Sequence, residues 1–77
     1  MARTTGTSRI VRVDRAERIG TSRMGNPSYT VYFTDGTSAR TQSDAGCAYG
    51  INNSEYRERD HMAHFTKAGR LAWLERI

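Results

Sequence analysis

The chain has 77 residues, of which 36% are hydrophobic, with a formal net charge of +4 and one cysteine. This length indicates one small domain near the lower limit for a self-sufficient core, so homo-oligomerisation or a partner could add stability. One cysteine excludes an internal disulfide and fits a reducing cytoplasm, and no apolar run approaches the ~20 residues that cross a bilayer. We therefore expect no membrane partner.

The positive charge is concentrated at the N-terminal end. The first 23 residues contain six arginines and two acidic residues, whereas the remainder of the chain is balanced. Such a segment favours an anionic partner, and we expect nucleic acid, specifically DNA. A GC-rich genome, or a solvated face with local ion pairs, would account for the same arginines. The candidate nucleic-acid-binding residues are Arg3, Arg9, Arg12, Arg15, Arg18 and Arg23.

The N-terminal third predicts an arm followed by strands. Residues 1–8 are small and polar, and we expect a disordered basic arm ahead of a domain that spans residues 9–77. The β-branched run Ile10–Val13 predicts a strand that can continue to residue 19, although its three-residue apolar spacing also fits a helix. The composition of Gly20–Pro27 predicts a loop or wide hairpin turn.

The clearest local pattern is a hairpin. Residues Tyr29–Thr34 alternate, which places Tyr32 on the opposite face from Val31 and Phe33. Asp35-Gly36 predicts a two-residue turn with positive φ angles, after which residues 37–41 return as the partner strand. Tyr32 is then a candidate for stacking on nucleic-acid bases or for an interface, and covering the small helix is its plainer role.

A short helix is expected over Ser43–Ile51. Ser43 would cap its first turn, Asp44 would lie beside the positive dipole end, and Gly50 would take the left-handed position after it. The next segment, Asn52–Asp60, is polar and charged and is expected to be a loop.

The C-terminal segment predicts a second hairpin. Residues 61–66 and 71–77 would be its strands, and the Lys67–Arg70 segment suits a type I turn closed by a glycine bulge. A helix is the alternative, but Gly69 inside it would cost about 1 kcal/mol. The predicted fold class is α+β, mainly β: a small antiparallel sheet that curls into an open barrel or half-barrel over the helix.

Motifs of catalysis and metal binding are absent from the sequence. There is no nucleophile elbow, phosphate loop or zinc-protease signature, so we expect neither an enzyme nor a cofactor. His61 and His64 would lie on opposite faces of a strand, which is a poor arrangement for a metal site with Cys47. Trp73 and Leu71 belong to the most apolar patch and are candidate interface residues.

The central pattern resembles small accessory proteins of unknown function encoded by phages of actinobacteria, mycobacteriophages in particular. The matching segments are Gly25-Asn26-Pro27, Tyr29-x-Val31-x-Phe33-x-Asp35-Gly36, Arg40-Thr41-x-x-Asp44-Ala45, Tyr49-Gly50-Ile51-x-Asn53-x-Glu55-Tyr56 and Thr66-x-Ala68-Gly69-Arg70. The resemblance implies a phage protein in the host cytoplasm and supplies no active site. We expect a non-enzymatic DNA-binding protein, or alternatively a module that binds a host protein or forms homo-oligomers.

Overall fold

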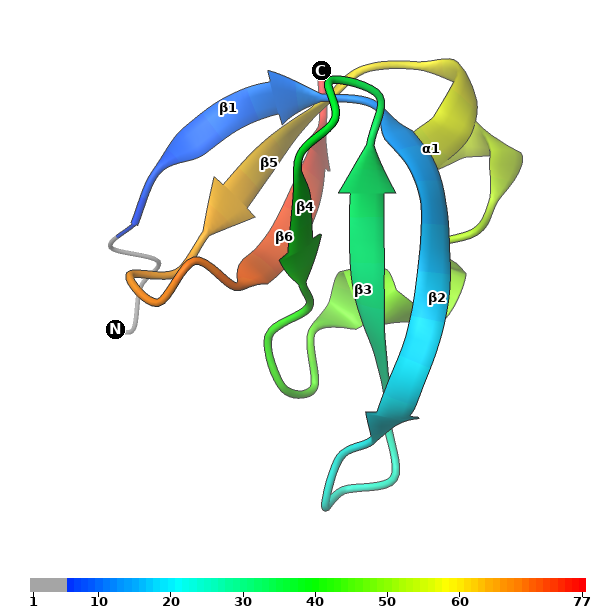
Figure 1. Ribbon diagram of the computed structural model, residues 1–77, viewed down its shortest axis with the longest axis vertical. Coiled ribbons are helices and arrows are strands. Elements are labelled where there is room, and N and C mark those ends of the chain that lie inside the picture. Colours follow the sequence, from blue (N-terminus) through cyan, green and yellow to red (C-terminus); the bar gives the residue numbers. More distant parts are fainter. Residues whose placement is uncertain (1–5) are drawn as a thin grey trace.

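Two three-stranded antiparallel sheets make up most of the structure, a computed structural model that describes residues 6–77 (Figure 1). One sheet has the order β1-β5-β6 and the other β2-β3-β4. Their strands are β1 (Ser8–Val11), β2 (Val13–Thr21), β3 (Pro27–Phe33), β4 (Ser38–Arg40), β5 (His61–Phe65) and β6 (Leu71–Arg76). Two short helices, η1 (Gly46–Gly50) and α1 (Ser54–Glu58), lie between β4 and β5. The predicted fold class, α+β and mainly β, is confirmed.

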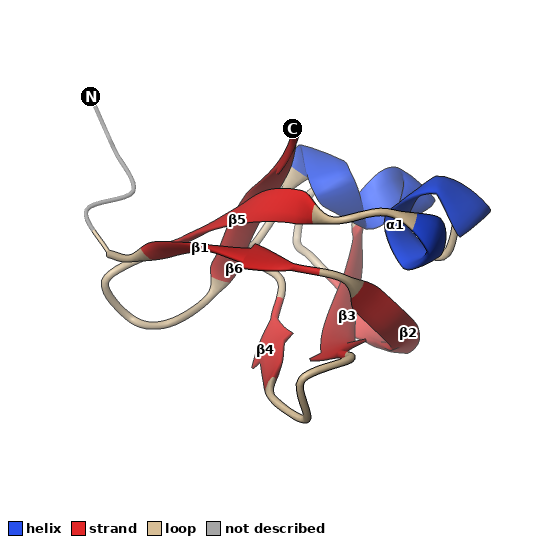
Figure 2. Cartoon of the chain, turned by 90° about the horizontal axis from the view of Figure 1, so that it is seen from above, coloured by secondary structure: helices blue, strands red, loops and turns tan. Residues whose placement is uncertain are grey.

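One bent strand joins the two sheets. Only Arg12 separates β1 from β2, and β1 pairs with β5 while β2 pairs with β3. At the opposite seam, Thr41 forms a parallel bridge with Leu71 at the start of β6. The strands therefore curl around a shared core as a half-barrel (Figure 2). The predicted strand after residue 10 is confirmed, and the alternative helix is wrong because this run is divided between two sheets.

The three hairpin turns share one geometry. At the β3–β4 turn, Gly36 N donates to Phe33 O (3.1 Å) and Phe33 N donates to Thr37 O (2.9 Å). The same pair of bonds closes the turns at residues 22–26 and 66–70, and the positive-φ glycines are Gly25, Gly36 and Gly69. These are the bonds of a type I turn closed by a glycine bulge. The C-terminal hairpin is thus confirmed. A two-residue Asp35-Gly36 turn is wrong, because only Gly36 has a positive φ.

The helix predicted over Ser43–Ile51 begins later than expected. It is a 3-10 helix over Gly46–Gly50 with no side-chain cap, so Ser43 is not its N-cap. Asp44 instead has a φ of 61°, and its carboxylate accepts hydrogen bonds from the Ser22 hydroxyl and the Asn26 amide. Asp44 therefore ties the β2–β3 turn to the segment before η1.

The segment expected to be a loop, Asn52–Asp60, contains α1. The helix has no fully buried residue, but the Tyr56 ring packs on His61 with ring centroids 4.8 Å apart. Tertiary packing therefore supports this single turn of helix, which is too short to be stable alone.

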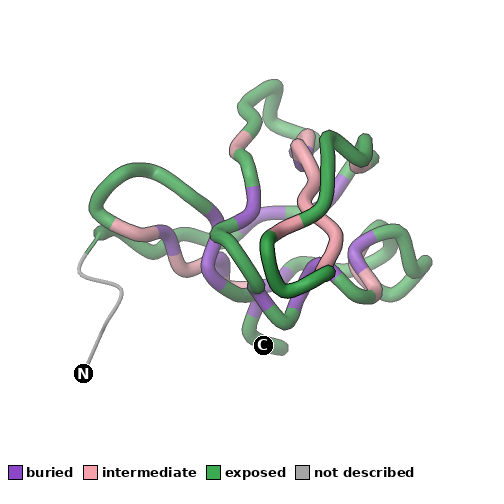
Figure 3. The backbone as a smooth tube through the Cα atoms, turned by 90° about the horizontal axis from the view of Figure 1, so that it is seen from below, coloured by how far each residue is buried: buried purple, intermediate pink, exposed green. Residues whose placement is uncertain are grey.

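The core lies between the two sheets. Its largest fully buried side chains are those of Val13, Val31, Ile51 and Leu71. Buried segments gather at the centre of the molecule, and the turns project from it (Figure 3). Alternation on β3 buries Val31 and Phe33 and turns Tyr32 outward, as predicted. Within residues 6–77, no helix is long and apolar enough to cross a bilayer.

Candidate nucleic-acid interface

Arg9 closes one end of the half-barrel. Its guanidinium carbon lies 4.9 Å from the Phe65 ring centroid and 5.6 Å from that of Phe33. Its Nη2 donates to Thr37 Oγ1 at 2.7 Å. The pKa of Asp35 is lowered, chiefly because Thr37 donates to its carboxylate, with a smaller contribution from the Arg9 charge. The Arg9 guanidinium therefore already has partners within the protein.

The other N-terminal arginines point in different directions. Arg12 pairs with Asp60 (Nε to Oδ1, 3.1 Å), whereas Arg18 donates to groups near the end of its own strand. Arg23 lies in the β2–β3 turn, and Arg3 lies outside the described residues. Strand alternation and the bulges of β2 separate these side chains. The structure does not bring the described N-terminal arginines, those from Arg9 to Arg23, together on one surface.

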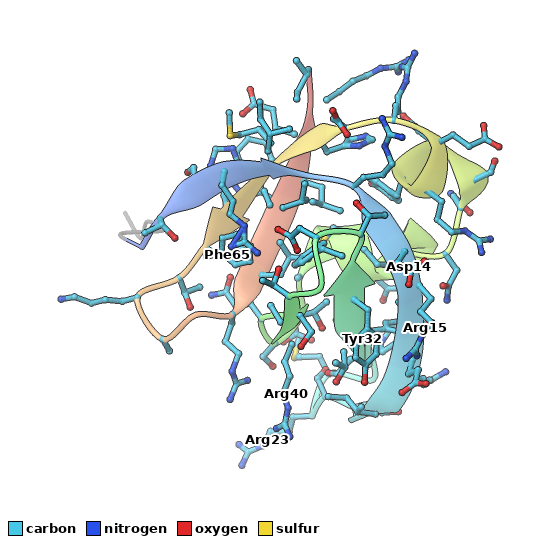
Figure 4. All side chains as sticks on the ribbon, turned by 45° about the horizontal axis from the view of Figure 1, so that its top comes forward. Asp14, Arg15, Arg23, Tyr32, Arg40 and Phe65 are labelled. Atoms are coloured by element: carbon cyan, nitrogen blue, oxygen red, sulfur yellow. The ribbon has the colours of Figure 1, made fainter. Side chains whose placement is uncertain are left out.

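The outer face of sheet β2-β3-β4 carries an aromatic ring beside arginines. Arg15 pairs in register with Tyr32, and Thr30, two residues earlier on β3, pairs with Arg40. The Arg15 guanidinium carbon lies 4.0 Å from the Tyr32 ring centroid. Glu17 accepts a hydrogen bond from each of these two side chains. Figure 4 shows Arg15 beside Tyr32, with Arg40 and Arg23 extending toward the lower end of the view.

Arg40 has a basic neighbour across the seam between the sheets. Because the Thr41–Leu71 bridge is parallel, the preceding residues, Arg40 and Arg70, occupy adjacent positions. Thr41 and Leu71 are buried, so alternation turns the two arginines outward, and both are exposed. Among residues 6–77, neither arginine has an acidic partner within ion-pair distance.

Three acidic groups of the electrically balanced part of the chain are already in ion pairs with other residues. The ion pairs of this part join Asp60 to Arg12, Glu55 to Arg76 and Glu75 to His64. Asp14 and Glu17 are both on β2, and Glu17 is hydrogen-bonded to Arg15 and Tyr32 on its outer face. Charges that cancel along the sequence are thus separated in space. Sequence reasoning missed Arg40 and Arg70 because the pairing that joins them spans 30 positions of the chain.

The two apolar interface candidates have different environments. Leu71 is fully buried, so its assignment to an interface is wrong: it fills the core where the sheets meet. Trp73 is 45% exposed on the outer face of sheet β1-β5-β6, and exposed Ile10 and half-buried Met62 lie on that face.

The three candidate metal ligands, Cys47, His61 and His64, do not form a cluster. His61 is buried and its Nδ1 lies 3.1 Å from Arg59 O, whereas His64 is on the outer face, as the strand spacing predicts. Burial raises the pKa of the Cys47 thiol to about 11. Within the described residues, no three His, Cys, Asp or Glu side chains are grouped to hold a metal ion.

The chain matches no protein-family model, and no curated protein or solved structure is significantly similar to it. The resemblance to actinobacterial phage proteins therefore stays a prediction.

Proposed function

We propose that this protein binds single-stranded DNA with the outer face of sheet β2-β3-β4 and the adjoining seam. The observation that carries the proposal is one outer surface with a half-buried aromatic ring, Tyr32, and two exposed arginines, Arg40 and Arg70, that form no ion pair within residues 6–77. The protein would bind DNA at that face without catalysing a reaction there, as a phage accessory protein in the host cytoplasm.

Each part of this surface has a physical role in binding. A base can stack on Tyr32, or on the planar guanidinium of Arg15 that lies over it, and such stacking contributes roughly 1–3 kcal/mol per base. Arg40 and Arg70 would contact successive phosphates. Phosphate contacts position the strand and make affinity fall with salt, so the expected binding has little sequence preference.

The test is the salt dependence of affinity, measured by fluorescence anisotropy with a labelled oligothymidylate and a duplex of equal length. We expect tighter binding of the single strand. Replacing both Arg40 and Arg70 with alanine should flatten the slope of log K against log salt by about 1.4, since each contact with a single strand contributes about 0.7. Tyr32→Leu should weaken binding while leaving that slope nearly unchanged.

Further variants distinguish the contribution of this surface to DNA affinity from that of the protein's overall charge. Arg57→Ala with Arg59→Ala removes the same charge in and after α1 and should leave the slope unchanged. Glu17→Gln should tighten binding, because it removes the carboxylate beside Arg15 and Tyr32. An absence of binding at low salt contradicts the proposal. So does binding that is lost only when residues 1–5 are deleted, because the arm ahead of β1 would then carry the contact.

A second candidate is an interaction module that uses the outer face of sheet β1-β5-β6. Its support is the exposure of Ile10 (55%) and Trp73 (45%) on one face, since exposed apolar groups that share a face are typical of interfaces. Sedimentation of the protein over a concentration series, with Trp73→Ser as the control, tests whether this face joins two copies. A concentration-independent monomer would leave a host protein as the partner to test with the same variant.

A further inference from the structure

Three polar side chains from three different strands form a hydrogen-bonded chain. The Ser8 hydroxyl lies 3.0 Å from His64 Nδ1, and His64 Nε2 lies 2.8 Å from Glu75 Oε1. Because a carboxylate can only accept, the neutral imidazole holds its proton on Nε2, which leaves Nδ1 free to accept from Ser8. This is the arrangement of a nucleophile, a base and the acid that orients the base.

The neighbouring strands hold the imidazole in place. Ser8 and Trp73 are the cross-strand partners of His64 in the register of sheet β1-β5-β6. The rings of His64 and Trp73 are stacked, with centroids 4.3 Å apart and planes inclined by 11°. The stacking fixes one face of the imidazole while both ring nitrogens keep their partners. Ser8 itself is exposed, so its hydroxyl is accessible to a substrate.

A backbone donor lies beside the same hydroxyl. Phe65 N donates to Thr7 O, so the backbone of Thr7 faces β5, and the amide of the next residue, Ser8, points to the opposite edge of β1. Among residues 6–77, no strand pairs with that edge at Ser8. Its N–H can therefore donate to the oxyanion that forms when the Ser8 hydroxyl attacks a carbonyl.

We propose that Ser8 is a nucleophilic serine that reacts with activated esters of apolar carboxylic acids. Ser8 Oγ attacks the carbonyl carbon and its proton passes to His64 Nδ1; the bond to the alkoxy or aryloxy group then breaks, and that group takes the proton from His64 and leaves as an alcohol or phenol. Water next attacks the acyl-serine and gives a proton to His64, which returns it to Ser8 Oγ as the acyl–oxygen bond breaks, so the carboxylic acid and free Ser8 are released. Glu75 positions His64, and the apolar side chains of Ile10, Met62 and Trp73 offer a surface for the acyl group.

The test combines covalent labelling with turnover. A fluorophosphonate probe, located by mass spectrometry, should label Ser8, and the protein should hydrolyse p-nitrophenyl butyrate. Ser8→Ala should abolish both, and His64→Gln should slow both by roughly 10²-fold or more, the usual contribution of a general base. Ser38, an exposed serine on β4, is the matched control: Ser38→Ala should change neither reaction.

The role of Glu75 has its own readout. Glu75→Gln should move the imidazole proton of His64 toward Nδ1, measured from the ring ¹⁵N shifts, and should slow labelling of Ser8 with the fold intact. If His64→Gln fails to fold, the labelling rate of Glu75→Gln still tests whether His64 activates Ser8. Labelling that is spread equally over Ser38 and Ser8 would overturn the proposal, as would an unchanged rate in a folded His64 or Glu75 variant. Ser8→Ala should leave DNA binding intact, so the two proposals fail independently.

Discussion

Replacing Arg9 with alanine should destabilise the fold and leave DNA affinity unchanged. The side chain spans one end of the half-barrel, where its guanidinium covers two core rings and donates to Thr37. An exposed cation–π contact contributes about 0.5–1 kcal/mol, and a hydrogen bond contributes a net ~1 kcal/mol. Together they give a loss of about 1.5 kcal/mol, which lowers the thermal midpoint of a domain of this size by about 6–12 °C.

Stability is measured by thermal unfolding, followed by the fluorescence of Trp73, the one tryptophan of the chain. DNA affinity is measured in parallel by fluorescence anisotropy with the labelled oligothymidylate. Arg9→Lys keeps the charge but not the planar fork, so it should lose most of the same stability. Arg18→Ala, at an exposed position of β2, should cost under about 0.5 kcal/mol. The reasoning is refuted if Arg9→Ala unfolds like the wild type yet binds DNA ten times more weakly, because Arg9 would then act at the interface.

Three further predictions concern buried or hydrogen-bonded groups. Leu71→Ala should cost about 3–5 kcal/mol in urea titrations, a large share of the roughly 4–12 kcal/mol available to this chain, whereas Leu71→Met should cost under about 1.5. The pKa of Asp44 is lowered from its ordinary value of 3.8, first by the hydrogen bond from Ser22 and then by the one from Asn26. The ionised carboxylate therefore stabilises the fold at pH values above 3.8, and this stabilisation is lost as the pH falls below that value. Asp44→Asn should remove this acid-dependent part of a plot of thermal midpoint against pH. Burial raises the pKa of Cys47 from 9.0 to about 11, so stability should fall as pH rises between those values, and a thiol reagent should react only after unfolding; rapid labelling of the native thiol at neutral pH would contradict the burial.

Local features of the fold were predictable, and long-range ones were not. The β3–β4 and β5–β6 hairpins follow from alternation and from glycines three residues after the turn begins, all within about a dozen positions. The pairing of β1 with β5 joins Ser8 to His64 across most of the chain, and no pattern near either residue indicates it. The capping role expected for Ser43 failed for the same reason. Asp44, which follows it, is instead bound to the distant β2–β3 turn.

The candidate sites show the same division. Tyr32 could be placed on an outer face because alternation along one strand decides it. Arg70 could not, because only the seam between the sheets places it beside Arg40. The Ser8–His64–Glu75 chain has no sequence motif either, since each residue comes from a different strand. Chemistry assembled across a sheet leaves no fixed spacing in the sequence.

Net charge along the chain was therefore an incomplete guide to where an anion would bind. A cation attracts a phosphate strongly only when no nearby carboxylate already neutralises it. By that criterion Arg12, paired with Asp60, is a weaker contact than its place in the basic segment suggests. Arg40 and Arg70 belong to a segment with no net charge, yet their acidic neighbours in the sequence are bound elsewhere in the fold. What decides the potential at a surface is which ion pairs the fold has already made, and here they leave the seam between the two sheets positive.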